Sequence, residues 1–90
     1  MCVNDIMALG VINTLKRHNI NVPENIAVTG FDDGIFAIAS PVPITTIYQD
    51  IKSIAKKSIQ TLISVIDKNT DISSAQDHII PVSLVTRDSI

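Results

Sequence analysis

The sequence predicts an α/β fold, because segments of strand character alternate with segments of helical periodicity. Residues 26–31 form a nearly continuous apolar run, as expected for a parallel strand that is covered on both faces. Residues 5–18 and 50–67 carry apolar side chains three or four positions apart, which is the spacing of one helix face. A strand, a helix and a second strand in this order predict a right-handed parallel βαβ unit.

The first helix is expected over residues 5–18, after a strand end at residues 1–3. Asn4 suits the N-cap position, because its side-chain oxygen can accept a hydrogen bond from a free backbone N–H. Asp5 in the first turn suits the positive end of the helix dipole, and Asn19 favours a left-handed residue at the helix end. The apolar stripe of this helix comprises Ile6, Leu9, Ile12 and Leu15, broadened by Met7, Ala8 and Val11.

Turn-forming residues separate the later elements. Residues 22–25 (VPEN) predict a turn before the strand, and Pro41 and Pro43 stiffen the link that follows. Residues 69–77 are polar and lack apolar periodicity, so we expect a loop there. The elements after the first helix are a strand over 26–31, a helical turn around 35–38, a strand over 44–48, a helix over 50–67 and a strand over 78–86.

The composition argues against several classes of function. The net charge is −2, whereas a DNA-binding domain normally carries a basic face. Aromatic residues make up 3% of the chain, which disfavours stacking on nucleic-acid bases. No apolar run approaches the roughly 20 residues of a membrane span, and the single cysteine fits a reducing cytoplasm. We therefore expect a cytoplasmic protein without membrane contact.

Polar side chains follow two segments of strand character, which suggests a small-molecule site. Asn4 follows residues 1–3, and Asp32 and Asp33 follow the strand over 26–31. In open α/β sheets, ligands bind at the carboxyl ends of the strands. A carboxylate such as that of Asp32 can accept charge-assisted hydrogen bonds from two hydroxyl groups. The alternative is structural, with Asn4 acting only as a helix cap and the aspartates only as turn residues.

The adjacent aspartates are poor candidates for catalysis. The two carboxylates of a glycosidase face each other across a bond, roughly 5–9 Å apart, whereas neighbouring side chains of an extended segment diverge to opposite faces. The sequence shows no Ser/His/Asp order, no metal-ligand cluster and no phosphate-binding loop. We therefore expect a protein that is not an enzyme, with no cofactor and no metal.

Six motifs lie in order along nearly the whole chain. They are NDIMALG at residues 4–10, INVPENIAV at 20–28, GFDD at 30–33, PITTI at 43–47, QD at 49–50 and IPVSLVTRDS at 80–89. In this order they resemble the carboxyl-terminal third of the LacI/GalR family of bacterial transcription regulators. The resemblance implies a regulatory domain similar to a periplasmic sugar-binding protein, with an effector cleft between two α/β subdomains.

The resemblance also implies that the chain is a partial periplasmic-binding-protein-like fold, a fragment straddling two subdomains. Residues 1–47 would form part of the carboxyl-terminal effector subdomain. Residues 48–81, with the helix over 50–67 and its loop, would belong to the amino-terminal subdomain, and residues 82–90 would return to the first. The family's members bind DNA through an amino-terminal helix-turn-helix domain, which we expect to be missing here.

The resemblance assigns effector binding to Asp32, Asn4 and Gln49. In the family the first aspartate of the GFDD motif commonly contacts the effector. The second, here Asp33, is mainly structural. Arg87 could pair with a carboxylate, and we expect it to be structural as well.

The first helix contributes to a dimer interface in the family, so the resemblance makes Leu9, Val11 and Ile12 candidate dimer residues. Plain packing on the sheet would explain most of the same side chains. The sequence therefore predicts the effector-binding and dimerisation part of a sugar-responsive regulator, with a small-molecule effector and a second copy of the chain as partners. Two alternatives stay open. One is a fragment of a transport-type periplasmic sugar-binding protein, and the other is a self-associating remnant without ligand function.

Overall fold

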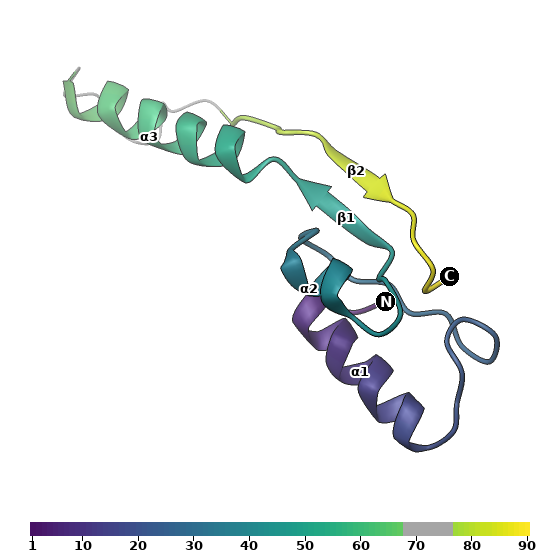
Figure 1. Cartoon of the computed structure of the whole chain (residues 1–90). Helices are drawn as coiled ribbons and strands as arrows, with labels where there is room; N and C mark the ends of the chain where they lie inside the picture. Colours follow the sequence, from purple (N-terminus) through teal and green to yellow (C-terminus); the bar gives the residue numbers. More distant parts are fainter. Residues whose placement is uncertain (68–76) are drawn as a thin grey trace. The chain divides into compact units, whose positions relative to one another are not determined.

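The computed structural model of the chain describes residues 1–67 and 77–90 (Figure 1). The chain divides into two compact units: unit 1 consists of residues 1–49 and 82–90, and unit 2 of residues 50–81. The predicted loop over 69–77 lies, except for its last residue, outside the described residues. The elements are, in chain order, α1 (Asp5–Arg17), α2 (Ile35–Ala39), β1 (Thr46–Gln49), α3 (Ile51–Asp67) and β2 (Val82–Val85).

Local hydrogen bonds define both ends of α1. Asn4 is its N-cap, and Asn4 Oδ1 accepts a hydrogen bond from the Met7 N–H at 2.9 Å. At the other end Asn19 has a φ of 57°, and the Ile20 N–H donates to the Leu15 carbonyl, a bond typical of the Schellman motif. The predicted cap and the predicted left-handed helix end are both confirmed.

The extended segment before α2 lies beside two other parts of unit 1. Thr29 and Asp32 form isolated parallel bridges with Thr45 and Tyr48. The Cys2 N–H donates to the Thr29 carbonyl at 2.7 Å, so the start of the chain runs beside the same segment. The predicted α/β arrangement, with α1 connecting two neighbouring extended segments, is therefore present.

Residues 26–31 do not form the continuous strand that the sequence predicts. Ile26 is 46% exposed, and the Val28 N–H donates to the Ser89 carbonyl near the end of the chain instead of to a parallel neighbour. A ladder needs a partner strand at successive positions. The bridges to residues 45–48 begin only at Thr29, so residues 26–28 have no parallel partner strand among the described residues.

The regular ladder among the described residues joins β1 and β2, and it is antiparallel. Thr46 lies opposite Val85, and Gln49 lies opposite Val82. The prediction of parallel units did not include this pair. β2 is also shorter than the predicted last strand, because Pro81 has no N–H to donate to a ladder.

A small aliphatic core holds unit 1 together. Figure 1 shows α2 beside the first turns of α1, and their facing side chains include two alanines, which permit close packing. The buried apolar residues are Ala8, Ile12, Val28, Ala37 and Ile44. Polar side chains are buried beside them, namely Asp5, Ser40, Thr45, Thr46 and Ser89.

Unit 2 is formed mainly by α3, which Asp50 caps. The Ser53 N–H donates to Asp50 Oδ1 at 3.0 Å, and the Ser53 hydroxyl donates to Asp50 Oδ2 at 2.7 Å. These bonds, the hydroxyl first, lower the pKa of the Asp50 carboxyl. In the described part of the chain no residue of α3 is buried, so its large apolar side chains are exposed: Ile51, Ile54, Ile59, Leu62, Ile63 and Ile66.

The described helices are all too short or too polar to cross a membrane.

Candidate functional site

Asp32 and Asp33 form a strained turn at the end of the bridged segment. Their φ angles are 105° and 55°. Residues other than glycine seldom adopt positive φ, which costs roughly 1–3 kcal/mol and persists only where the surrounding structure imposes it. Such strain concentrates at functional sites. The contacts around the turn must therefore hold Asp32 and Asp33 in these conformations.

The structure brings two of the predicted effector-binding residues together. Gln49 Nε2 donates a hydrogen bond to Asp32 Oδ1 at 2.7 Å. The backbone supports this contact, because the Asp32 N–H donates to the Ile47 carbonyl at 2.9 Å and so holds the turn beside β1. Asp32 is exposed and Gln49 is half-buried, so the pair is accessible to a ligand.

Asn4, the third predicted residue, has a structural role that the geometry makes plain. Its Oδ1 is engaged by the Met7 N–H of α1. Its neighbour Asp5 donates a backbone hydrogen bond to the Phe31 carbonyl at 3.0 Å, which holds the start of α1 beside the residue that precedes Asp32. Asn4 therefore lies on the segment next to the turn, and the described hydrogen bonds do not join its side chain to Asp32 or Gln49.

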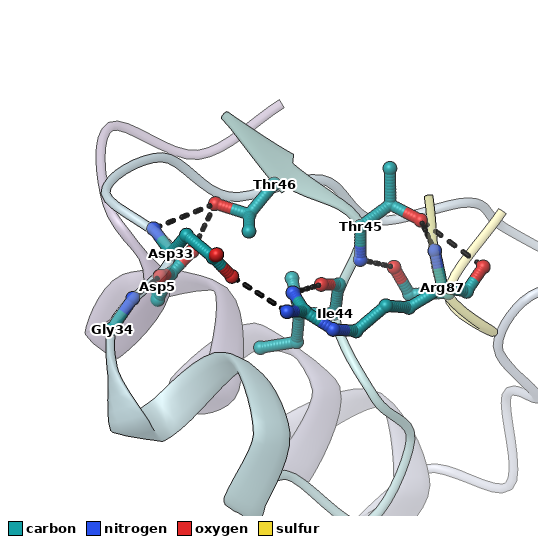
Figure 2. Close-up of polar contacts among 8 residues, drawn as sticks. Asp5, Asp33, Gly34, Ile44, Thr45, Thr46 and Arg87 are labelled. Atoms are coloured by element: carbon teal, nitrogen blue, oxygen red, sulfur yellow. Dashed lines mark hydrogen bonds and ion pairs between the residues drawn. The ribbon is translucent and has the colours of Figure 1, made fainter. Parts of the chain in front are cut away.

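Asp5 is expected from the sequence only to complement the helix dipole, but it is also a buried neighbour of the turn. It is 3% exposed. Its Oδ1 accepts a hydrogen bond from the Thr46 hydroxyl at 2.6 Å, and its Oδ2 accepts one from the Gly34 N–H at 2.8 Å (Figure 2). Gly30 permits this close approach, because a Cβ there would collide with Asp5 Oδ1. In the sequence, the feature that could have indicated this close contact is the pair of glycines, Gly30 and Gly34, on either side of the two aspartates.

Asp33 is paired with Arg87, which confirms the structural role expected of both. The Arg87 Nη2 lies 2.6 Å from Asp33 Oδ1, and each side chain is 18% exposed. Arg87 Nη1 also donates to the Ile44 carbonyl at 2.9 Å (Figure 2). Because Arg87 follows β2, this ion pair fixes the turn from the opposite end of the chain.

The predicted dimer residues on α1 differ in their exposure. Ile12 is 2% exposed and belongs to the core, so its assignment to an interface is wrong. Leu9 packs partly against the same core, and Val11 is 36% exposed. The helical periodicity could not separate these positions, because core and interface stripes of one helix share the same spacing.

The bridged βαβ arrangement and the antiparallel strand pair define an α/β domain, with polar candidate residues at the ends of its extended segments. Over residues 1–90 the sequence matches the family described as the periplasmic binding protein-like domain. The chain belongs to this family.

In the described residues, no group of three His, Cys, Asp or Glu side chains could hold a metal ion.

The relatives of the chain include transcription repressors. It is 34% identical over 90 residues to the HTH-type transcriptional repressor PurR of Vibrio vulnificus (strain CMCP6), covering 99% of this chain and 26% of that protein. Among solved structures, it is similar to the Lac repressor dimer bound to operator and the anti-inducer ONPF. The TM-score is 0.83 and the identity 30%, over 99% of this chain and 30% of that chain.

A second solved structure extends the comparison. The complex of the transcriptional regulator CelR with cellobiose has a TM-score of 0.89 and 25% identity, over 97% of this chain and 26% of that chain. These relatives agree with the LacI/GalR resemblance predicted from the six motifs, and they are repressors or regulators and not enzymes. The chain spans about a quarter of the length of the curated relatives it matches.

Proposed function

We propose that this chain is the carboxyl-terminal part of the effector-binding domain of a LacI/GalR-type transcription regulator, and that Asp32, Gln49 and Asn4 bind hydroxyl groups of a sugar-like effector. The observation that carries the proposal is the hydrogen bond between Asp32 and Gln49, which unites two residues from separate motifs in an accessible pair. The solved complex of a related regulator with cellobiose supports the class of effector.

The chemistry of the pair suits a sugar. A hydroxyl group both donates and accepts hydrogen bonds. The Asp32 carboxylate accepts, and the Gln49 amide donates through Nε2 and accepts through Oε1. Bonds to a charged acceptor are short and strong, so two neighbouring hydroxyls on one ring could share Asp32. Asn4, whose Oδ1 serves α1, would contribute its Nδ2 as a donor.

In the intact regulator we assign unit 1 to the carboxyl-terminal effector subdomain, with residues 82–90 returning to it, and unit 2 to the amino-terminal subdomain. A second copy would pack on the exposed part of α1 around Val11 and Leu9. The effector would act by binding one conformation better than another, and so would change operator affinity. DNA binding would come from a helix-turn-helix domain outside these residues, in the cytoplasm.

The alternative of a transport-type binding protein shares the same fold. The relatives named above are repressors and regulators, which favours the regulator. The alternative of a self-associating remnant draws support from the exposed apolar side chains of α3, since large exposed apolar patches promote association. It does not account for the paired Asp32 and Gln49.

Saturation-transfer NMR on the full chain tests the proposal, with cellobiose, D-ribose and D-glucose as probes. Asp32→Asn keeps the size of the side chain and removes its charge. We expect roughly 10–100-fold weaker binding, because a hydrogen bond to a charged group contributes about 1.5–3 kcal/mol. Asp88→Asn is the matched control, since it removes an exposed carboxylate outside the site.

Two results would count against the proposal. Unchanged binding by Asp32→Asn would contradict the role of Asp32. Failure of the wild-type chain to bind any of the three sugars would contradict the proposed effector class for this chain.

A further inference from the structure

Asp5 makes hydrogen bonds to both ends of the turn that carries Asp32. Its backbone N–H donates to the carbonyl of Phe31, the residue before Asp32, at 3.0 Å. Its carboxylate accepts from the N–H of Gly34, two residues after Asp32, at 2.8 Å. One residue at the start of α1 therefore fixes the chain immediately before and after the strained turn.

The hydroxyl of Thr46 adds a second link between Asp5 and the turn. It donates to Asp5 Oδ1 at 2.6 Å and accepts from the Asp33 N–H at 3.4 Å, as Figure 2 shows. Thr46 is 1% exposed and lies in β1, the strand that ends at Gln49. The same hydroxyl thus connects the buried carboxylate, the turn and the strand that carries Gln49.

These contacts leave Asp5 little freedom to move. Both of its carboxylate oxygens are occupied, its side chain is buried, and Gly30 lies so close that even a methyl group would collide with it. Buried hydrogen bonds to a charged group are stronger than exposed ones, because no water competes for the partners. Asp5 can therefore hold a backbone conformation that an aspartate does not adopt readily by itself.

We propose that Asp5 is a positioning residue for effector binding: its carboxylate holds residues 31–34 so that the Asp32 carboxylate faces Gln49. The inference rests on the proposed function for the identity of the binding groups. Without Asp5 the φ of Asp32 would relax from 105° toward negative values, and the Asp32 carboxylate would turn away from the Gln49 amide. Asp5 does not itself touch the effector and acts only through Asp32.

The side-chain amide signals of Gln49, measured by NMR on the full chain, report this contact without any ligand. The hydrogen bond to Asp32 should shift one amide proton downfield, and Asp32→Ala gives the reference position without the acceptor. Asp5→Asn removes the positioning charge. Thr46→Val removes the linking hydroxyl at nearly constant shape, and Thr46→Ser is its matched control because it keeps the hydroxyl.

Asp5→Asn and Thr46→Val should move the Gln49 amide signal to its position in Asp32→Ala, while far-UV circular dichroism stays helical. Thr46→Ser should keep the wild-type position. Where cellobiose binds, the first two variants should bind it about tenfold more weakly, as expected for one lost buried hydrogen bond.

A wild-type Gln49 signal in folded Thr46→Val would overturn the inference, as would the absence of a downfield amide proton in the wild-type chain. If Asp5→Asn does not fold, the comparison of Thr46→Val with Thr46→Ser tests the inference by itself. A wild-type chain that shows the amide signal but binds no sugar would contradict the proposed function and leave the positioning role of Asp5 supported.

Discussion

Adding one methyl group at Gly30 and at Gly10 should change the stability of the protein in opposite directions. A Cβ at Gly30 would collide with Asp5 Oδ1 and lie 3.2 Å from Asp5 Cα. Because Cα belongs to the backbone of α1, rotating a side chain cannot relieve this contact. A Cβ at Gly10 would meet nothing within 4 Å. The two substitutions therefore compare the same chemical change at a filled and at an open position.

The magnitude follows from these surroundings. Neither glycine has a positive φ, so alanine introduces no backbone strain. Overpacking a filled site costs typically about 1–3 kcal/mol, and a displaced Asp5 would leave buried partners unsatisfied at about 1–3 kcal/mol each. We expect Gly30→Ala to lower the free energy of unfolding by about 2–4 kcal/mol. Gly10→Ala, inside a helix, should raise it by about 0.5–1 kcal/mol.

Urea unfolding followed by tyrosine fluorescence measures both effects. Tyr48 is the only tyrosine, the chain has no tryptophan, and Tyr48 lies in β1, so the signal reports unit 1. Thermal unfolding provides a second measurement, because about 1 kcal/mol shifts the Tm of a domain this small by about 4–8 °C. If Gly30→Ala is as stable as the wild type, the close approach of Asp5 to Gly30 is refuted.

Further substitutions test three other contacts. Asn4→Ala should cost about 1 kcal/mol of stability through loss of the cap, whereas Asn4→Ser should keep the stability and weaken only cellobiose binding, as thermal unfolding and NMR would show. Arg87→Met leaves Asp33 without its partner and should cost about 1–3 kcal/mol in urea unfolding; no measurable cost would mean that solvent screens the pair. Because hydrogen bonds from Ser53 lower the pKa of Asp50, its contribution to the stability of α3 is complete above the ordinary value of 3.8 and is lost as the pH falls through the lowered pKa of the folded state. Circular dichroism between about pH 5 and about pH 2 should show this loss of helix in the wild type and a smaller one in Asp50→Ser, whose uncharged hydroxyl caps at every pH.

The sequence predicts the helices to within a residue because their limits are encoded locally. Asn4 and Asn19 mark the ends of α1, and Asp50 marks the start of α3. Strands depend on partners that lie far along the chain. Periodicity could not show that the Val28 N–H bonds Ser89, and so it extended the strand over 26–31 beyond its paired residues.

In the candidate site, too, some residues could be predicted from local sequence and others depend on contacts that are distant along the chain. The six motifs name Asp32 and Gln49, which the structure then joins. The role of Asp5 could not be predicted, because a charged residue in the first turn of a helix is expected to be exposed. Its burial depends on Gly34 and Thr46, which lie 29 and 41 positions further along the chain. Candidate binding residues can be recognised from a motif, whereas the residues that contact and fix their backbone are found only from the tertiary structure.

The register of the strand pair has a consequence for protein engineering. Gln49 faces Val82 at the end of the ladder, so the chain leaves unit 1 and re-enters it at adjacent positions. Residues 50–81 are therefore an excisable insert, and a two-residue Asn-Gly turn would close β1 and β2 into a hairpin. The shortened chain would retain every residue that forms the described hydrogen bonds with Asp5 and Asp32. Its circular dichroism and Tyr48 fluorescence would show whether unit 1, with these residues, folds alone.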